Sequence, residues 1–297
     1  MPPCWRRTRG QIRARTHNLI LLIMTTSQHH MAFIGGGNMA SAIIGGLLRQ
    51  GMTPAQITVV EPFAETATKL HKDFGITALP AATAALRQAD LVVWAVKPQM
   101  FSEAAAPVMP HTRAALHLSV AAGIRTDSIC QWVDTPRVVR CMPNTPALVG
   151  QGITGLFPCP SVTVTDKALV EQVIGTTGQY LWVQQESQLD AVTALSGSGP
   201  AYVFYFLEAM TEAGVGMGLS AEQAYKLAVA TFSGASALAA ASTESPEVLR
   251  QRVTSKGGTT YAAITSMEAS GVKPLFVKAM QAAEVRAREL GDEFGKA

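Results

Sequence analysis

Short apolar runs alternate with helix-like stretches between residues 31 and 183. Repeated alternation of this kind, with short links, predicts an α/β fold built on a doubly wound parallel sheet with right-handed crossovers. The run 91–96 is apolar throughout, which is typical of a strand buried on both faces, and it is the expected central strand. The expected strands are 31–34, 57–60, a weak one near 76, 91–96, 115–120, 137–142, 154–157 and 180–183. The expected helices run to residue 50 and then over 63–74, 81–88, 101–108 and 126–133, with one more, capped by Asp166, before 169–174.

After Gln184 the pattern changes to helix almost everywhere, with no strand signal. A long apolar stretch, 190–217, is interrupted by a Ser-Gly-Ser-Gly-Pro sequence at 196–200, which we expect to bend or break it. Ser220 with Gln223 forms a capping box for the next helix, and Ser245-Pro246 has the order preferred at a helix start. Two further helices are expected at 260–269 and 274–290.

Large apolar residues lie on several faces of these helices, which indicates that a partner chain buries part of them. We therefore expect a homodimer formed through the helical region. The expected organisation is an extension over 1–30, a dinucleotide-binding domain over 31–186, and a helical dimerisation and substrate-binding domain over 187–297.

The first 30 residues differ from the rest in charge. They hold five arginines and no acidic residue, with an apolar run at 19–24. We interpret them as a disordered extension of a chain whose folded part begins near Met24 or Met31; a mitochondrial presequence is the alternative. A secretory signal is not expected, because these residues have neither a long enough apolar core nor a small-residue cleavage site. Removing the five arginines takes the net charge from +3 to −2, so the basic balance gives no support for nucleic-acid binding.

Composition narrows the class further. A chain of 297 residues is long enough for two domains. No apolar run is long enough to cross a bilayer, so no membrane association is expected. The four cysteines are scattered without metal-ligand spacing, which predicts no bound metal, no disulfide framework, and reduced thiols in a cytoplasmic protein. They are Cys4, Cys130, Cys141 and Cys159.

A glycine turn follows the first strand. Gly35, Gly37 and Ala40 fit the G-x-G-x-x-G/A pattern, in which glycines make the turn and admit a pyrophosphate and the last small residue lets the helix pack on the strand. The second strand ends at Glu61, where an acidic side chain accepts hydrogen bonds from a ribose hydroxyl. We therefore expect a Rossmann-like cofactor site formed by Ile34, Gly35, Gly36, Gly37, Asn38, Met39 and Glu61.

Three other strand ends face the same edge of the predicted sheet, where ligands of open α/β sheets bind. Each is an ordinary turn if taken alone, but together they favour a pocket. The first two add Ala95, Val96, Lys97, Pro98, Ala121, Ala122 and Gly123 to the expected cofactor contacts; the third, 142–146, is a Pro-rich loop expected to wall the pocket.

A second glycine turn precedes a helix in the C-terminal region. Gly257 and Gly258 lead into Thr259 and Thr260, so free N–H groups at the helix start can hold an anion beside two hydroxyls. The alternative is an ordinary glycine-rich helix start. The sequence thus predicts two anion sites, one for a pyrophosphate and one for a small acid.

In order along the chain, five segments resemble the motifs of pyrroline-5-carboxylate reductases. They are Ile-Gly-Gly-Gly-Asn-Met at 34–39, Ala-Val-Lys-Pro at 95–98, Arg-Cys-Met-Pro-Asn-Thr-Pro at 140–146, Leu-Ser-Gly-Ser-Gly-Pro-Ala-Tyr at 195–202 and Ser-Lys-Gly-Gly-Thr-Thr at 255–260. The resemblance implies reduction of the cyclic imine 1-pyrroline-5-carboxylate to L-proline by NADPH or NADH, the last step of proline biosynthesis.

The resemblance also implies site residues and an assembly. Thr260 is the implied catalytic residue, with its hydroxyl on the ring nitrogen, and backbone groups of Gly258, Thr259 and Thr260 hold the carboxylate, with Ser255 also in the substrate site. The family implies interlocked dimers, often in larger rings such as a pentamer of dimers, with the active site between one subunit's nucleotide domain and its partner's helices.

The residues themselves favour an imine over a ketone. Reduction of a carbonyl requires a proton donor such as Lys, His or Tyr near the new alkoxide, whereas an imine can arrive already protonated. No Lys, Arg or His occurs between Gln188 and Tyr225. The rivals are a 6-phosphogluconate or hydroxyacid dehydrogenase, which needs a proton-transfer lysine in the first long helix, and a catalytically silent nucleotide-binding regulator. We interpret His71, His111 and His117 as structural or surface residues.

Three positions depart from the family pattern. Lys256 stands where proline is common, and Ala82 and Arg252 stand where some members have asparagine, which puts two cofactor contacts in doubt. Glu61 favours NADH, although the family is often described as preferring NADPH.

Overall fold

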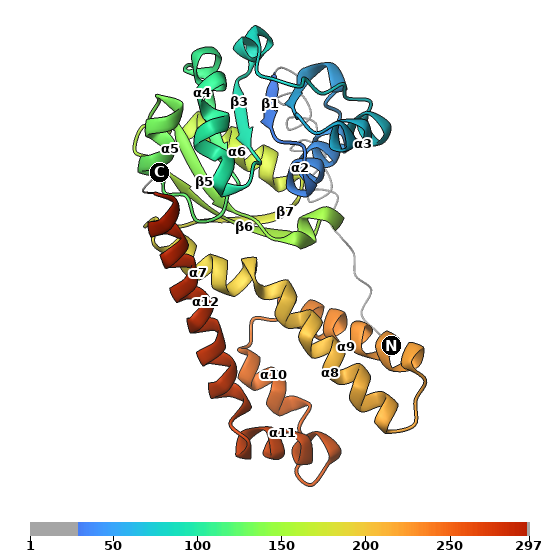
Figure 1. The fold of residues 1–297 in the computed structure, drawn as a ribbon. Coiled ribbons are helices and arrows are strands. Elements are labelled where there is room, and N and C mark those ends of the chain that lie inside the picture. Colours follow the sequence, from blue (N-terminus) through green and yellow to red (C-terminus); the bar gives the residue numbers. More distant parts are fainter. Residues whose placement is uncertain (1–28, 296–297) are drawn as a thin grey trace, which may run out of the picture. The chain divides into compact units, whose positions relative to one another are not determined.

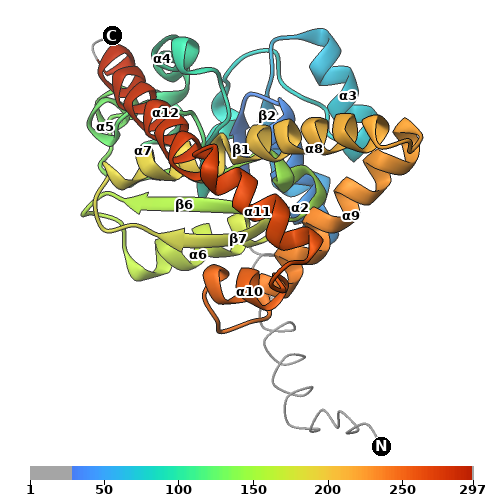
Figure 2. The ribbon, with the colours of Figure 1, turned by 90° about the horizontal axis from the view of Figure 1, so that it is seen from below.

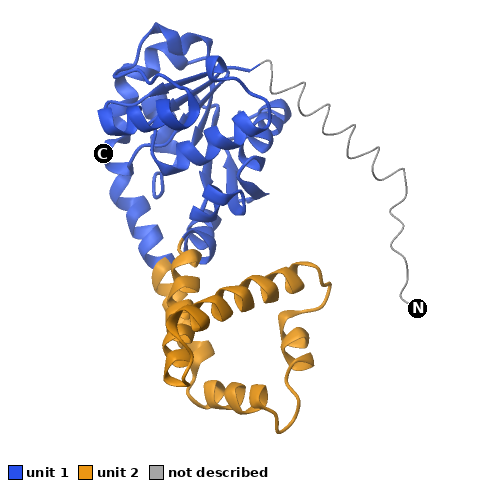
Figure 3. Ribbon diagram, turned by 90° about the vertical axis from the view of Figure 1, so that its right-hand side faces the viewer, with its two compact units in different colours: residues 1–197, 284–297 blue, residues 198–283 orange. Residues whose placement is uncertain are grey.

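The computed structural model describes residues 29–295, which form two compact units (Figures 1 and 3). Unit 1 comprises the described part of Met1–Gly197 together with that of Glu284–Ala297, and unit 2 comprises Ser198–Ala283. The expected basic extension falls almost wholly outside the described residues.

Unit 1 contains a seven-stranded sheet in the order β2-β1-β3-β4-β5-β6-β7. Every neighbouring pair is parallel except β5 and β6. The α/β prediction is therefore confirmed, with one change of direction that the alternating pattern did not predict. The strands are β1 (Met31–Ile34), β2 (Ile57–Val60), β3 (Leu91–Trp94), β4 (Leu116–Ser119), β5 (Val138–Met142), β6 (Gly152–Pro158) and β7 (Gly178–Trp182).

The reversal at β6 has a simple cause. Only a 3-10 turn, Thr145–Val149, lies between β5 and β6, and a parallel return requires a crossover of a dozen or more residues. β3 is buried along its whole length, as expected, but β4 takes the middle place in the sheet. The weak strand near Ile76 is reduced to one parallel bridge between Val60 and Leu79.

Helices cover both faces of the sheet (Figures 1 and 2). Alternate residues of β1 point to opposite faces: Phe33 packs in one apolar cluster with helices α2, α3 and α6, whereas Ala32 and Ile34 pack in a second cluster with α4 and α5. The helices are α2 (Asn38–Arg49), α3 (Ala64–Phe74), α4 (Phe101–Thr112), α5 (Thr126–Val133) and α6 (Val164–Gly175). The expected helix at 81–88 is a shorter 3-10 helix, Ala84–Gln88.

The start of α6 corrects one prediction. Thr163, not Asp166, is the N-cap residue, and Asp166 is the third helical residue of a capping box in which each side chain accepts from the other's backbone N–H. Asp166 also pairs with Arg137 at 2.6 Å. Arg137 and the Thr163 cap together hold the pKa of this carboxyl below its ordinary value, against the opposing effect of burial.

A break interrupts the long apolar stretch 190–217, as the sequence indicates. Helix α7 (Gln188–Val192) runs into a π-helical turn at Thr193–Gly197, and α8 (Gly199–Gly216) begins with Pro200 in its first turn. Unit 2 starts at this point.

Unit 2 consists of helices joined by short loops, with no strand among residues 198–283. It holds α8, α9 (Ala221–Ala240), α10 (Pro246–Arg252), α11 (Thr259–Ala269) and the first part of α12 (Val272–Phe294), whose last part belongs to unit 1. The Ser220–Gln223 capping box and the Ser245-Pro246 helix start are confirmed. Helices α8 and α9 pack closely because Gly214 lies against Ala224.

Little of unit 2 is buried within the chain. Helices α10 and α11 have no buried residue, and α8 and α9 bury only Leu207, Gly214, Ala224 and Ala228. Large side chains such as Phe204, Tyr205 and Leu238 are more than half exposed. A set of helices with such faces lacks the cover that stabilises helices in a protein core.

Candidate active site

The glycine turn after β1 lies against the end of β3. Gly35 has a φ of +91°, and a Cβ added to it would come within 2.6 Å of the Ala95 carbonyl oxygen and 3.2 Å of Val96 Cγ1. Only glycine satisfies both the conformation and the close approach. The Ala95 N–H donates to the Ile34 carbonyl at 2.8 Å, so the structure brings two of the predicted cofactor segments together.

Glu61 holds this turn in place. It follows β2, its side chain is buried with 6% exposed, and Oε2 accepts from the Gly36 N–H at 2.8 Å. Its other oxygen, Oε1, accepts from the Phe63 N–H at 2.9 Å. Each carboxylate oxygen keeps another acceptor position, so a ribose hydroxyl is an additional partner and not a replacement.

The start of α2 is suited to a phosphate. Gly37 is its N-cap residue, and among the described residues no side chain caps the helix and no acid lies in its first turn. Gly37 and Asn38 are exposed, Met39 is half-buried, and a Cβ added to Gly37 meets nothing within 4 Å. The uncapped N–H groups and the open space beside Gly37 fit a dinucleotide pyrophosphate.

The next two strand ends differ in character. After β3, Lys97 is exposed and Pro98 starts a 3-10 turn. After β4, Ala121 is buried and Ala122 is half-buried. Gly123 has a φ of +78°, and its bare Cα faces Phe294 and Leu290 of α12, which an added Cβ would approach to 3.1 and 3.3 Å. The small residue at 123 thus serves helix packing, in addition to any room it leaves for a ring.

A buried histidine links the two strands β3 and β4 by a side-chain hydrogen bond. His117 on β4 accepts from Trp94 Nε1 at 2.9 Å through Nδ1, so its Nε2 carries the proton and faces the Thr112 carbonyl at 3.0 Å. Burial lowers the pKa of His117 to about 4, which keeps the ring neutral. His71 is exposed on α3 and His111 is half-buried on α4. His117 is thus a buried, hydrogen-bonded residue of the core, whereas His71 and His111 lie on helices away from the strand ends.

Sequence reasoning missed a charged network around Arg140. This arginine is buried on β5 and pairs with Glu186 at 2.9 Å, with Asp190 3.9 Å away. Glu186 also accepts from the backbone N–H and the hydroxyl of Thr126, both at 2.7 Å. The arginine inside the strand-like run 137–142 is the feature that could have indicated this network, because a buried arginine is almost always paired with an acidic residue. The network joins β5, the start of α5 and the residues before α7.

The loop after β5 is fixed by Asn144. Its side-chain N–H donates to the Ser196 carbonyl at 3.2 Å, and its side-chain oxygen accepts from the Ile153 N–H at 3.0 Å. These bonds tie the predicted Pro-rich wall to β6 and to the π-helical turn. The side chain therefore gives the loop a defined shape.

The second glycine turn, in unit 2, folds as a helix start. Gly257 has a φ of +77°, Gly258 donates to the Ser255 carbonyl at 3.0 Å, and Gly258 is the N-cap residue of α11. The helix begins at Thr259, one residue before the expected position, and no described side chain caps it. Ser255, Lys256, Thr259 and Thr260 are all exposed. The uncapped first turn fits a small carboxylate, and the meeting of this turn with the cofactor site stays a prediction.

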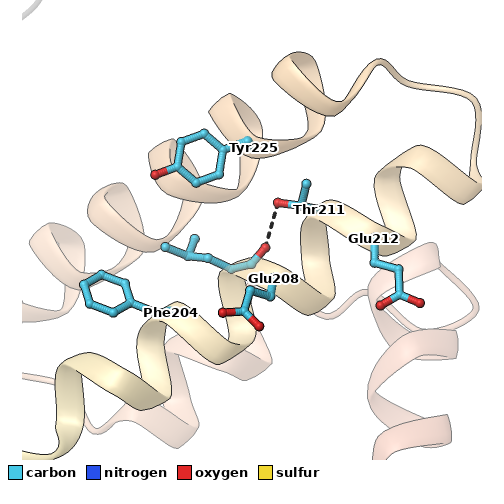
Figure 4. A pocket seen from close by; sticks show the side chains of 6 residues that line it. Phe204, Glu208, Thr211, Glu212 and Tyr225 are labelled. Atoms are coloured by element: carbon cyan, nitrogen blue, oxygen red, sulfur yellow. Dashed lines mark hydrogen bonds between the residues drawn. The ribbon is translucent and has the colours of Figure 1, made fainter.

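A separate apolar groove lies between α8 and α9 (Figure 4). It contains none of the motif residues. Phe204 and Tyr225 stand over it with 58% and 57% of their surfaces exposed. Its lining comprises Phe204, Leu207, Glu208, Thr211, Glu212 and Tyr225.

The described residues contain neither a metal-binding cluster nor a membrane-spanning helix. Over residues 29–295 we find no cluster of three or more His, Cys, Asp or Glu side chains placed to bind a metal ion. In the same part of the chain, none of the helices combines the length and the apolar character needed to span a bilayer.

Two family profiles match the chain. Residues 186–290 match the profile described as pyrroline-5-carboxylate reductase dimerisation. Residues 30–123 match the profile described as NADP oxidoreductase coenzyme F420-dependent. The first lies over the helical region and the second over the first strands of the sheet.

Curated proteins and solved structures agree with these profiles. A pyrroline-5-carboxylate reductase of Pseudomonas aeruginosa is 44% identical over 91% of this chain and 100% of its own length. That of Glycine max is 37% identical over 88% of this chain and 95% of its own. The structure of the Coxiella burnetii enzyme has a TM-score of 0.82 at 38% identity, covering 88% of this chain and 98% of that one.

A further solved structure is of Plasmodium falciparum pyrroline carboxylate reductase with NADP bound, with a TM-score of 0.80 at 27% identity over 89% of this chain and 99% of that one. The likeness spans both the sheet with its glycine turn and the helices with theirs. The chain therefore belongs to the pyrroline-5-carboxylate reductase family.

Proposed function

We propose that this protein reduces 1-pyrroline-5-carboxylate to L-proline, the last step of proline biosynthesis. The observation that carries the proposal is the pair of uncapped, glycine-led helix starts at Gly37 and Gly258, in a chain of this family. The first suits a pyrophosphate and the second suits a small carboxylate. Bound NADH or NADPH supplies the hydride.

The protein's own residues act mainly by positioning. Backbone groups of Gly258, Thr259 and Thr260 hold the substrate carboxylate, with Ser255 beside them. The N–H groups of Thr259 and Thr260 are the free donors, because that of Gly258 donates to the Ser255 carbonyl. The Thr260 hydroxyl hydrogen-bonds the ring nitrogen and keeps the imine carbon facing the nicotinamide, so two reactants are held in one geometry. The protonated imine takes up the hydride and becomes the neutral ring amine, so no alkoxide forms and no lysine is required as a proton donor in α8.

The cofactor contacts follow the strand ends. The pyrophosphate lies on the turn Ile34, Gly35, Gly36, Gly37, Asn38 and Met39, while Ala95, Val96, Lys97 and Pro98 and then Ala121, Ala122 and Gly123 line the path to the nicotinamide. Glu61 supports a finer proposal, that NADH is used at least as well as NADPH. Its carboxylate is fixed by two backbone N–H groups and buried, so it cannot turn away from a 2′-phosphate at low cost.

We further propose that a second copy of this chain covers the groove between α8 and α9. The support is the exposed apolar surface of α8 and α9 and the dimerisation profile over residues 186–290. In the same proposal, residues 31–186 bind the dinucleotide, and residues 187–297 form the dimer and hold the substrate. Five dimers assemble into a ring, a pentamer of dimers, and the enzyme works in the cytoplasm. The mass of the assembly in solution shows separately whether the dimer forms and whether the ring forms.

One assay tests the reaction. Loss of reduced-nicotinamide absorbance is followed with 1-pyrroline-5-carboxylate, and 6-phosphogluconate and simple hydroxyacids are offered in the oxidative direction with NAD or NADP. We expect turnover of 1-pyrroline-5-carboxylate and of none of the other substrates. Turnover of a hydroxyacid would assign the protein to the dehydrogenase class, and dinucleotide binding without any turnover would make it a silent regulator.

A further inference from the structure

Two cysteines far apart in sequence meet in unit 1. Cys130 lies in α5 and Cys159 lies directly after β6, and their Sγ atoms are 3.6 Å apart. Both are free thiols. In the proposed reaction neither touches substrate or cofactor, so the pair has no role in the function derived above.

The backbone holds both cysteines in this position. The Cys159 N–H donates to the Val138 carbonyl at 2.9 Å, and the Cys159 carbonyl accepts from Val162 at 3.0 Å. The Cys130 carbonyl accepts from Thr135 at 3.3 Å. The two sulfurs are therefore neighbours because the sheet and α5 place them so, and not through a loose loop.

Access and ionisation differ between the cysteines. Cys130 is half-buried, so a small oxidant reaches the pair from its side, whereas Cys159 is buried with 7% exposed. The hydrogen bond between the two thiols lowers the pKa of Cys159, while that same bond and burial raise the pKa of Cys130. Cys141, in contrast, is enclosed in the core, where burial raises its pKa, and its thiol donates to the Ser119 carbonyl at 3.1 Å. Thiolates, not thiols, react with peroxides.

We propose that Cys130 and Cys159 form a reversible redox site, oxidised by hydrogen peroxide to an intramolecular disulfide. The Cys159 thiolate attacks one peroxide oxygen, the O–O bond breaks, and the sulfur becomes a sulfenic acid while hydroxide leaves and takes a proton to form water. The Cys130 sulfur then attacks that sulfenic sulfur, its proton leaves with the hydroxyl group as a second water, and the S–S bond forms. Two thiols are thus oxidised while one molecule of hydrogen peroxide is reduced.

The geometry requires a small movement. The sulfurs must approach from 3.6 Å to about 2 Å to form the bond. The bond would join α5 to the end of β6 and close a loop of about 30 residues, which restricts the unfolded chain. An excess of a small thiol such as dithiothreitol reverses the oxidation by exchange.

The test uses the full chain with Cys4→Ser and Cys141→Ala, so that only the proposed pair remains. The protein is treated with hydrogen peroxide, free thiols are alkylated, and tryptic peptides are analysed by mass spectrometry. The expected product is peptide 126–137 linked to peptide 141–167, two hydrogens lighter than the separate peptides and released by dithiothreitol. Alkylated or sulfinic Cys130 and Cys159 without the link would overturn the proposal.

A second measurement guards against disturbance by the background substitutions. In the wild-type chain, oxidation is expected to raise the midpoint of thermal unfolding by roughly 5 °C, and dithiothreitol to reverse the rise. Cys130→Ser and Cys159→Ser are the matched controls and should show no rise. An equal rise in either variant would also refute the pair, and both measurements are independent of the reductase activity.

Discussion

Thr260 is an exposed residue in the first turn of α11, in a helix start that no described side chain caps. Replacing Thr260 with Ala should remove one hydrogen bond to the charged imine, which lowers kcat/KM by roughly 10- to 100-fold. Dinucleotide affinity should change much less. Steady-state kinetics and fluorescence titration with NADH measure the two quantities.

Thr260→Ser is the matched control, because it keeps the hydroxyl and should recover most of the activity. Equal losses of turnover and dinucleotide binding in Thr260→Ala would mean that the residue is structural.

Glu61 is the residue on which cofactor choice is expected to depend. The wild type should use NADH at least as efficiently as NADPH, because a fixed, buried carboxylate repels a 2′-phosphate. Glu61→Gln removes the charge and should shift the ratio of kcat/KM values toward NADPH by about tenfold. A wild-type enzyme with a strong NADPH preference contradicts the argument, whatever the variant does.

His117 predicts a pH dependence of stability. Its pKa is lowered from 6.5 in the unfolded chain to about 4 in the folded protein, so the unfolded chain binds a proton in this window that the folded protein does not. The stability is therefore complete above pH 6.5 and falls as the pH drops toward 4, by about 3 kcal/mol in all. Urea unfolding at several pH values measures the fall.

His117→Asn removes this titration, so the difference between variant and wild type isolates it from other groups. Asp190, for example, has its pKa raised by burial and contributes in the opposite direction in both proteins. Parallel pH profiles for the two proteins would show that His117 is not the cause.

At the scale of elements, the glycine pair in α2 tests the packing of helix on helix. A Cβ on Gly46 would come within 2.4 Å of Thr176 Oγ1 and 2.9 Å of the Thr176 carbonyl oxygen, so backbone must move. Gly46→Ala should lower the free energy of unfolding by about 1–3 kcal/mol despite the better helix propensity of alanine.

Gly45→Ala is the matched control on the same helix. The atoms nearest to its Cβ would be the ring of Phe74 and the end of Arg49, at 3.2 and 3.3 Å, and these side chains can move. This substitution should therefore be neutral or stabilising by up to about 1 kcal/mol. Equal destabilisation by the two substitutions, measured by chemical denaturation, would contradict the packing argument.

At the scale of the whole molecule, the exposed face of α8 and α9 should be buried in the dimer. Phe204→Glu puts a charge on that face and should dissociate the dimer and reduce activity, because a buried unpaired charge is costly. Val164→Glu, at a position 85% exposed on α6 and outside the dimerisation profile, is the control and should leave both unchanged. Light scattering gives the mass of the assembly. If the Phe204→Glu protein stays dimeric, the dimer interface lies on another surface.

Several features of this protein depend on local chemistry and were therefore predictable from sequence. The glycine turn at Gly35, the capping box at Ser220 and Gln223, and the second turn at Gly257 each need particular residue types within a few positions. The buried strand β3 is visible as a continuous apolar run. Such signals carry over directly because the backbone conformation of a short segment follows from its own residues.

Other features were decided by tertiary structure, because they join residues that sequence keeps far apart. Sequence does not show that Glu61 binds the Gly36 N–H, that Gly123 faces α12, that Arg140 meets Glu186, or that Cys130 lies beside Cys159. Nor did the alternating pattern reveal the antiparallel β6. The sequence by itself determined most of the elements, the family motifs and the two glycine turns that lead into helices. The tertiary structure decided which side chains meet, because such contacts depend on the packing of the whole sheet and its helices.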